Sequence, residues 1–316
     1  MTALARRSTA LAVIALLTIT ACGAETDLTG VDVTGVDDSG ADDSGADDED
    51  RDDENDDGAA SADDCSQEAL SGDDPEYAFV AAYRIVDGEL GELCFGTEDD
   101  TVLDAWESLA VITPPGQLGD LTLFGGFEPD GDGAAETLAY VNVLDADGTS
   151  FQMSVNTVEA VADPDELLLT LAHEFAHVFT GISTQLDRSD EAIDACTTYF
   201  NGEGCFLDDA LITAWITAFW PPELVETVDP FEDSAEDAEA RCAVDSGFFG
   251  QYAATNPEED FAEAFSAFVF RLEPNTDGQA ARLDWIEQQP GLLEFRERAD
   301  AAGLTPLANR FELCGA

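Results

Sequence analysis

The chain has 316 residues, of which 70 are Asp or Glu and 11 are Lys or Arg, so its formal net charge is −59. All of the basic residues are arginine. Because so acidic a surface repels phosphate, the composition argues against nucleic acid as a partner. It leaves open either a preference for cationic substrates or adaptation to a salty habitat.

The first residues have the pattern of an export signal. Arg6 and Arg7 precede a short apolar run at 10–19, and small residues then lead into Cys22. The apolar run is too short to span a membrane comfortably. Small residues before a cysteine resemble a bacterial lipobox, in which the cysteine is lipidated; the alternative is an ordinary cleaved signal. We therefore expect a lipoprotein signal peptide at 1–21 and a protein that is lipid-anchored to the bacterial cell membrane, outside the cytoplasm.

Residues 22–64 form a separate acidic region. It contains repeats such as Asp-Asp-Ser-Gly-Ala, and Arg51 is its single basic residue. The segment has no periodic apolar residues to bury and its like charges repel, so we expect a disordered tether. Its carboxylates do not have the spacing of a calcium loop. The simplest role is a spacer that holds the next domain away from a membrane.

Residues 65–316 have the composition of one globular domain of about 250 residues, enough for a large core. The chain has seven cysteines. With Cys22 set aside, an even number remains and no C-x-x-C occurs, which favours disulfides over a thiolate metal site. Six cysteines allow fifteen pairings. The pairs we expect are Cys65–Cys94, Cys196–Cys205 and Cys242–Cys314. We expect the protein to be a monomer.

The first part of this domain is predicted to be mixed in secondary structure. Alternating apolar residues over 138–144 and 149–157 predict two paired strands, with the turn at 145–148. The other elements expected before residue 160 are helices over 76–86 and 101–110 and a short strand over 121–124.

The strongest chemical pattern lies in residues 167–180, LLLTLAHEFAHVFT, where His173, Glu174 and His177 form H-E-x-x-H. Histidines four residues apart project from one face of a helix, so one metal ion can bind both. Zinc binds imidazole nitrogen readily, and a catalytic zinc keeps one position for water. Glu174 is placed to act on that water as a general base. The chain has only two histidines, and both are in this motif.

The flanks of the motif favour a helix. Asp163 is a good N-cap, Pro164 suits the first helical position, and Glu166 completes a capping box. The apolar residues follow helical spacing and define a core face away from the histidines. A buried helix with two hydrogen-bonded histidines is the alternative interpretation. After the motif, further helices are expected over 191–200, 207–219, 261–272 and 282–299.

A small sheet followed by an H-E-x-x-H helix resembles the zincin arrangement. We therefore expect an α+β, zincin-like fold, in which a small mixed sheet precedes a mainly helical subdomain that carries the motif helix. In zincins the edge strand of the sheet pairs with an extended substrate backbone. We expect that edge among residues 138–157.

The third metal ligand must be a carboxylate, or less readily a tyrosine or water, because no further histidine exists. The histidine-rich metzincin pattern is excluded, since the only methionine besides Met1 is Met153, ahead of the motif. Asp187, Asp190 and Asp194 follow the motif closely enough to be candidates for an aspartate ligand.

Residues 252–265, YAATNPEEDFAEAF, together with HEFAH resemble the catalytic domain of the anthrax lethal factor group of glutamate zincins. In that group a tyrosine precedes a Thr-Asn step and an acidic helix that runs into Phe-Ala-Glu-Ala-Phe. The resemblance implies that Tyr252 is the active-site tyrosine, that Glu259 is the glutamate ligand, and that Glu263 is a carboxylate behind a metal-binding histidine. The insert that precedes residue 252 is longer than in that group, so substrate preference does not carry over.

Each of these residues also has a purely structural interpretation. Asn256 predicts an N-cap, so Glu259 can fold back on its amide as a capping box. Glu263 lies one turn further along the same face, and spacing alone does not choose between the two glutamates as the ligand. Tyr252 can be a packing residue.

The function expected from these residues is hydrolysis of peptide bonds by a membrane-tethered zinc peptidase outside the cytoplasm. Its partners are then a peptide or protein substrate and, through the N-terminal lipid, a membrane. The alternative is a non-catalytic, zinc-containing binding or scaffolding lipoprotein, which has no need of Glu174. A zinc-buffering lipoprotein that binds metal through its acidic tail is a third interpretation.

Overall fold

The computed structural model describes residues 65–72, 74–189, 196–231, 234–304 and 314. The expected signal peptide (1–21), the tether (22–64) with Cys22, and Asp190 and Asp194 lie outside the described residues. Among the helices of the described ranges, none combines the length and the apolar character that crossing a membrane requires.

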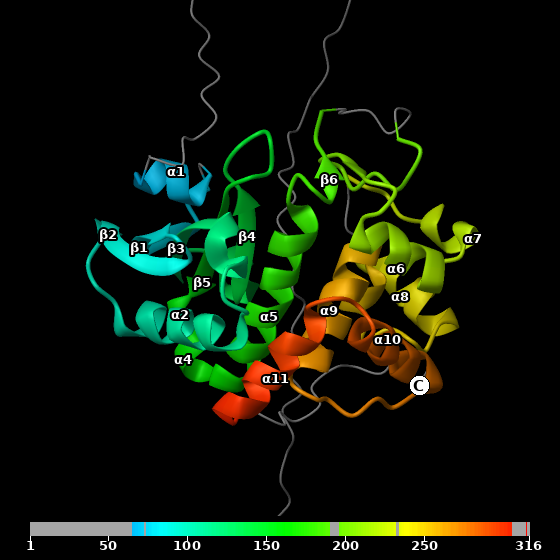
Figure 1. Cartoon of the computed structure of the whole chain (residues 1–316). Helices are drawn as coiled ribbons and strands as arrows, with labels where there is room; N and C mark the ends of the chain where they lie inside the picture. The colour runs from blue at the N-terminus through cyan, green and yellow to red at the C-terminus, as the bar shows by residue number, and fades with distance from the viewer. Residues whose placement is uncertain (1–64, 73, 190–195, 232–233, 305–313, 315–316) are drawn as a thin grey trace, which may run out of the picture.

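A five-stranded mixed sheet has the strand order β2-β1-β3-β5-β4 (Figure 1). The strands are β1 (Tyr77–Val86), β2 (Glu89–Gly96), β3 (Leu121–Pro129), β4 (Ala139–Val143) and β5 (Phe151–Asn156). β3 and β5 run parallel, and the other neighbouring pairs are antiparallel. β4 is therefore an edge strand, which confirms the prediction of a sheet edge within 138–157.

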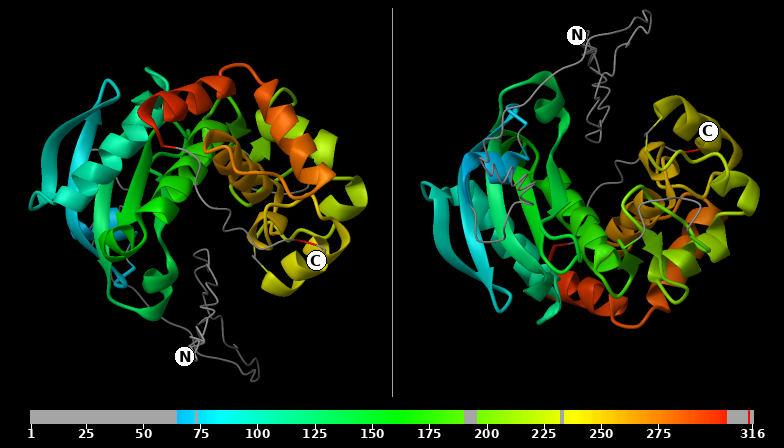
Figure 2. Two further views of the ribbon diagram at one scale, coloured as in Figure 1. Left: turned by 90° about the horizontal axis from the view of Figure 1, so that it is seen from below. Right: turned by 90° about the horizontal axis from the view of Figure 1, so that it is seen from above.

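Helices make up most of the rest of the described chain, so the mixed α+β class is confirmed. Those in the first part are α1 (Gln67–Ser71), α2 (Asp100–Ile112), η1 (Gln117–Asp120), α3 (Asp132–Glu136), α4 (Thr157–Ala162) and α5 (Pro164–Gly181). The later ones are α6 (Leu211–Phe219), α7 (Pro222–Val225), α8 (Ala235–Val244), η3 (Tyr252–Ala254), α9 (Pro257–Val269), α10 (Asp277–Glu287) and α11 (Leu292–Ala302). A short pair, β6 (Leu186–Asp187) and β7 (Cys205–Phe206), lies between the two groups. Both views of Figure 2 show α5 between the sheet and α6–α10.

The prediction of a helix over 76–86 is wrong, because this segment is the central strand β1. Its alanines favour a helix, but a short apolar run cannot be assigned from periodicity alone. β1 pairs with β2 on one side and β3 on the other, and a register shift lies between Phe79 and Ala81. Phe79 therefore contributes to a small core on one face of the sheet and Ala81 to the large core on the other. Burial on both faces explains why most of the segment is apolar.

The other predicted elements of the first part are confirmed, with changed ends. The helix over 101–110 is α2, the strand at 121–124 extends through Pro129 as β3, and the paired strands are β4 and β5. β2 was not predicted from the sequence. Apolar and polar residues alternate only weakly in β2, because most of its residues are half-buried or exposed. The sequence therefore gives little signal of a strand here.

The predictions after the motif are confirmed in part. Residues 196–200 are not helical, and 191–195 lie outside the described chain. A turn forms here instead, in which Oδ1 of Asn201 accepts the backbone N–H groups of Glu203 and Gly204. The helix over 261–272 is α9, which begins earlier, and the one over 282–299 is divided into α10 and α11. The division falls at Gly291, whose φ of 84° is unfavourable for residues with a side chain.

Three disulfides join Cys65 to Cys94, Cys196 to Cys205 and Cys242 to Cys314, as predicted. The first ties the segment before α1 to β2, and the second closes the turn around Asn201. The third joins α8 to the C-terminal end of the chain. Each disulfide thus constrains a different part of the domain.

Aromatic packing joins α5 to α9 on the sides that face the core. Phe179 of α5 makes edge-on contacts with Phe261 and Phe265 of α9, at ring-centroid distances of 6.0 and 5.2 Å. A buried hydrogen bond of 2.8 Å from Oγ of Ser266 to the carbonyl oxygen of Leu169 also connects the two helices. Aromatic pairs contribute about 0.5–1.5 kcal/mol beyond their area burial, so these contacts fix the position of α9 along α5.

Candidate metal centre

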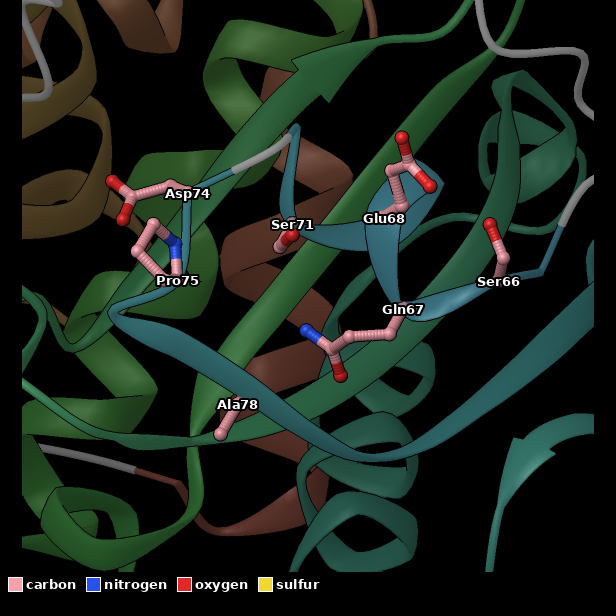
Figure 3. A pocket seen from close by; sticks show the side chains of 7 residues that line it. All are labelled: Ser66, Gln67, Glu68, Ser71, Asp74, Pro75 and Ala78. Carbon is pink, nitrogen blue, oxygen red and sulfur yellow. The ribbon is translucent and has the colours of Figure 1, made fainter.

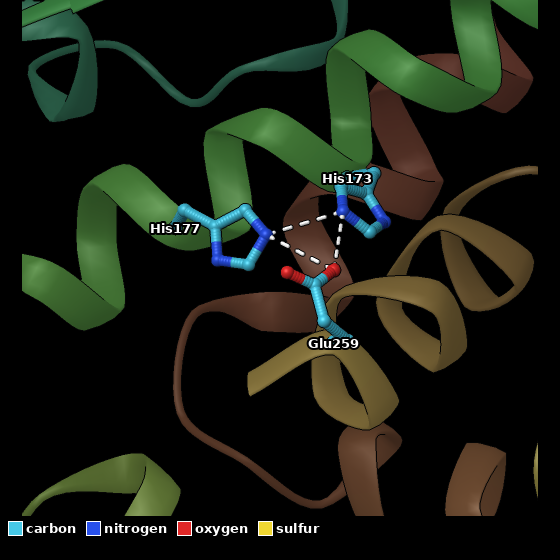
Figure 4. Close-up of side chains that lie close together, drawn as sticks. All are labelled: His173, His177 and Glu259. Atoms are coloured by element: carbon cyan, nitrogen blue, oxygen red, sulfur yellow. Dashed lines mark hydrogen bonds and ion pairs between the residues drawn. The ribbon is translucent and has the colours of Figure 1, made fainter. Parts of the chain in front are cut away.

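The helix α5 presents both histidines of the motif on one face. It begins as predicted, because Oδ1 of Asp163 accepts the N–H of Glu166 at 3.2 Å and Pro164 occupies the first turn. His173 and His177 lie one turn apart, and their Nε2 atoms approach to 3.1 Å. His173 is only 6% exposed. In Figure 4 both Nε2 atoms point toward the carboxylate of Glu259 on α9.

The carboxylate of Glu259 completes a cluster with these nitrogens. Asn256 caps α9 by accepting the N–H of Glu259 at 2.9 Å, and Pro257 begins the helix. From this first turn, Oε2 of Glu259 reaches to 3.0 Å from Nε2 of His173 and 3.5 Å from Nε2 of His177. Figure 4 shows the three side chains converging from the two helices. Within the described chain they are the group of His, Cys, Asp and Glu that could hold a metal ion.

The three donor atoms have the spacing of ligands around one small cation. Their separations are 3.0, 3.1 and 3.5 Å. Metal–ligand bonds of about 2.0–2.2 Å in a tetrahedron separate the ligand atoms by about 3.3–3.6 Å. Oε2 of Glu259 is also buried without a well-aligned hydrogen-bond donor among the described residues. Two imidazole nitrogens and one carboxylate oxygen therefore fit a divalent transition metal, including zinc.

Glu263 contacts the opposite nitrogen of His173. Its Oε1 lies 3.2 Å from Nδ1 of His173, one helical turn beyond Glu259. A carboxylate at Nδ1 favours the tautomer in which Nε2 is free to bind metal. This arrangement favours Glu259 over Glu263 as the ligand. Asp187 is exposed in β6, where its carboxylate accepts the N–H of Ser189, so it is not part of the cluster.

The protonation of the cluster depends on burial and on the mixture of charges. Burial alone lowers the pKa of His173, but the carboxylates of Glu259 and Glu263 raise it well above its usual range. Burial raises the pKa of Glu259, but the two histidines lower it further than burial raises it. The carboxylates thus favour protonated histidines, and the histidines favour an ionised Glu259. Because a metal ion displaces these protons, metal affinity should increase with pH.

Glu174 follows His173 on α5 and is partly buried. Burial raises the pKa of Glu174 to about 7, while the nearby histidines lower it. A carboxylate with a pKa near neutrality can both accept and return a proton at the pH of most extracellular fluids. Burial therefore makes Glu174 a better proton acceptor than an exposed glutamate.

Tyr252 lies beside the cluster, at the start of η3. Its ring centroid is 5.8 Å from that of His173, with an angle of 31° between the ring planes. The residue is half-buried. The structure thus brings Tyr252, Glu259 and Glu263 to the two histidines, although the chemical roles of these residues remain predictions.

A buried polar network around Asp260 of α9 was not predicted from the sequence. Asp260 accepts hydrogen bonds from the indole N–H groups of Trp215 and Trp220, both at 2.9 Å, and pairs with Arg282 at 2.9 Å. In the sequence Asp260 resembles an ordinary acidic residue in a first helical turn, and only the tertiary structure reveals its partners. Losing one member of such a buried ion pair typically costs about 3–5 kcal/mol, so the network strongly fixes the residue next to Glu259.

A shallow hollow of about 690 Å³ lies elsewhere, beside α1 and the start of β1 (Figure 3). It is lined by Ser66, Gln67, Glu68, Ser71, Asp74, Pro75 and Ala78. None of these residues belongs to the histidine–glutamate cluster. The chemistry of the cluster, rather than the volume of this hollow, therefore identifies the candidate site.

Comparisons with protein-family models, with curated proteins and with solved structures returned no match to this chain. The case for a function therefore depends on the geometry of the residues themselves.

Proposed function

We propose that residues 65–316 form a zincin-like domain that hydrolyses peptide bonds with one zinc ion. The observation that supports this most strongly is the triangle of donor atoms from His173, His177 and Glu259, with Glu174 in the same motif. The sheet that precedes α5 and the helical half that follows it are compatible with a zincin-like arrangement. A site that only stored or displayed zinc has no need of a glutamate beside its first ligand.

His173, His177 and Glu259 would hold the zinc, which would supply a Lewis acid for the peptide carbonyl and for a water molecule. Glu174 then accepts a proton from the attacking water and transfers it to the leaving amine as the C–N bond breaks. Tyr252 donates its hydroxyl proton in a hydrogen bond to the developing oxyanion. Glu263 holds Nδ1 of His173 and so keeps Nε2 directed at the metal.

The edge strand β4 is the proposed place for the substrate backbone. β4 pairs with β5 on one side only, from Ala139 opposite Val155 to Val143 opposite Phe151. It also packs beside α5, the helix that carries the histidines. An extended peptide can add to such an edge through backbone hydrogen bonds, which would carry its scissile bond past the cluster.

Removal and return of metal provide the direct test of this function. Purified protein is incubated with a peptide library, and cleavage products are identified by mass spectrometry. We expect cleavage by the zinc-loaded protein, none after treatment with a chelator, and recovery when one equivalent of zinc is restored. Cleavage that survives complete metal removal, or a zinc-loaded protein that cleaves no library peptide, would contradict the proposal. Metal analysis of the untreated protein tests zinc against iron, which also binds two histidines and one carboxylate.

We also propose that the N-terminal region anchors this domain to a membrane through a lipid on Cys22. Acyl chains contribute about 0.8 kcal/mol per buried CH₂ group, so a diacylated cysteine binds a bilayer stably. Cys22→Ser should therefore move the protein from the membrane fraction into the soluble fraction. Fractionation followed by immunoblotting measures this, with Ser8→Ala as a control in the same leader. A Cys22→Ser variant that still sediments with membranes would contradict the lipid anchor but not the peptidase.

A further inference from the structure

Arg241, on α8, makes an unusually complete set of backbone contacts beside the candidate site. The residue is only 5% exposed. Its Nε donates to the carbonyl oxygen of Ala254 at 2.6 Å, and its Nη2 donates to that of Thr255 at 2.7 Å. Its Nη1 donates to the carbonyl oxygen of Thr227 at 2.9 Å and to the hydroxyl of the same residue at 3.2 Å. One guanidinium therefore joins the segment after α7 to the segment between η3 and α9.

The two carbonyl groups that Arg241 holds next to α9 lie between the predicted tyrosine and the predicted metal ligand. The N–H of Thr255 donates to the carbonyl oxygen of Tyr252 at 2.9 Å, which closes the turn of η3. The next residue, Asn256, caps α9 by accepting the N–H of Glu259. Short-range contacts therefore connect Tyr252 to Glu259 without a break. The segment between them includes Ala254 and Thr255, whose carbonyl oxygens accept hydrogen bonds from Arg241.

We propose that Arg241 is a positioning residue for the metal centre, which sets Tyr252 and Glu259 in their places opposite α5. This inference rests on the proposed peptidase function. Arginine suits the task because its planar guanidinium carries five N–H donors in a fixed fork and can bind several carbonyl groups at once. α8 itself is held by the following residue, Cys242, which is bonded to Cys314. The guanidinium therefore extends from a helix that a disulfide ties to Cys314.

The chain offers a matched control for this residue. Arg298, on α11, donates to the carbonyl oxygens of Val111 and Ala110 at 3.0 and 3.1 Å, at the end of α2. It makes the same kind of contact with two successive carbonyl groups, but neither belongs to the segment that carries the site. Both arginines hold two successive carbonyl groups, but Arg241 also binds Thr227, so Arg241→Met removes more hydrogen bonds than Arg298→Met. Only the change at Arg241 acts on Tyr252 and Glu259.

The experiment compares Arg241→Met, Arg241→Lys and Arg298→Met in the full chain, solubilised in detergent. Zinc affinity is measured by competition with a chelator, and kcat and KM are measured on one library peptide. We expect Arg241→Met to lower zinc affinity about 10-fold and kcat about 10–100-fold with KM nearly unchanged, as small misplacements of catalytic groups do. Arg241→Lys should recover part of both losses. Arg298→Met should also lower thermal stability, by a smaller amount, while zinc affinity and kcat stay within about 2-fold of the parent, since distant sites act independently.

A double substitution separates positioning from general destabilisation. If Arg241 acts partly through Tyr252, its effect on kcat should shrink to about 3-fold or less in a Tyr252→Phe background, because residues that work through one another are not additive. Effects that simply multiply, or an Arg241→Met variant with parental zinc affinity and kcat, would overturn the proposal. Should Arg241→Met fail to fold, Arg241→Lys with the same measurements decides the question. If the parent protein binds zinc and cleaves peptides but these variants match it, the positioning proposal alone is wrong. If the parent binds no zinc, the proposed function is wrong as well.

Discussion

Glu174→Gln is expected to reduce peptide turnover by at least about 100-fold, because a general base contributes about 10²–10⁴-fold to such reactions. Glutamine has the same shape as glutamate but cannot accept a proton. Since Glu174 is not among the three donor atoms of the cluster, zinc stoichiometry and thermal unfolding should stay close to those of the parent. The measurement is kcat on one cleaved peptide, with zinc determined on the same samples.

Glu166→Gln is the matched control for this change. Glu166 lies in the first turn of the same helix, two turns before the motif, so the substitution changes charge on α5 without touching the site. Its turnover should remain within about 2-fold of the parent, as most surface substitutions have small effects. Equal activity in Glu174→Gln and Glu166→Gln would exclude the proposed role of Glu174, whatever the metal content.

Glu259→Ala and Glu263→Ala are expected to differ sharply in metal binding. Oε2 of Glu259 faces Nε2 of both histidines, whereas Glu263 contacts only Nδ1 of His173. Glu259→Ala should therefore fail to retain one zinc per chain after dialysis. Glu263→Ala should retain it with affinity or activity lowered about 10–100-fold, which is the usual effect of losing a carboxylate behind a histidine ligand. Zinc stoichiometry and chelator competition on the two variants side by side measure this.

Asp187→Ala provides the third sample in that comparison. Because Asp187 is exposed and bonded to the N–H of Ser189, its removal should leave zinc affinity unchanged. The opposite order, in which Glu263→Ala loses the metal and Glu259→Ala keeps it, would transfer the role of ligand to Glu263. Loss of metal in Asp187→Ala would instead support an aspartate ligand.

Local rules predicted the two helices that carry the candidate site better than they predicted the sheet, whereas the choice of Glu259 as the ligand came from the family resemblance. The helix of the motif has a proline, a capping aspartate and regular apolar spacing, so its start and its two faces follow from nearby residues. Asn256 and Pro257 likewise mark the start of α9, and the position of Glu259 in its first turn follows from them. These signals are short-range, and short-range patterns are what a single sequence reports most directly.

The residues that hold the site together could not be predicted, because their partners are remote in the chain. Asp260 looks like a favourable charge at a helix start, yet it is buried against two indole groups and Arg282. Arg241 resembles a surface charge on an acidic helix, yet it binds carbonyl groups in another segment. β1 was assigned to the wrong class for the same reason, since pairing with β2 and β3 overrides the helix preference of its alanines.

Besides the histidine–glutamate contacts, α5 and α9 are joined by Phe179 packed against Phe261 and Phe265 and by the hydrogen bond of Ser266. These aromatic contacts and this hydrogen bond involve no metal ligand, so we expect them to hold the two helices together whether or not a metal is bound. In a zinc finger the metal drives the folding of the chain, and its binding free energy is folding free energy. If the proposed site binds zinc, we expect the loss of chain entropy on binding to be small, because other contacts already hold the two helices together. We therefore expect the metal-free protein to remain folded, so that zinc can be removed and restored repeatedly without unfolding.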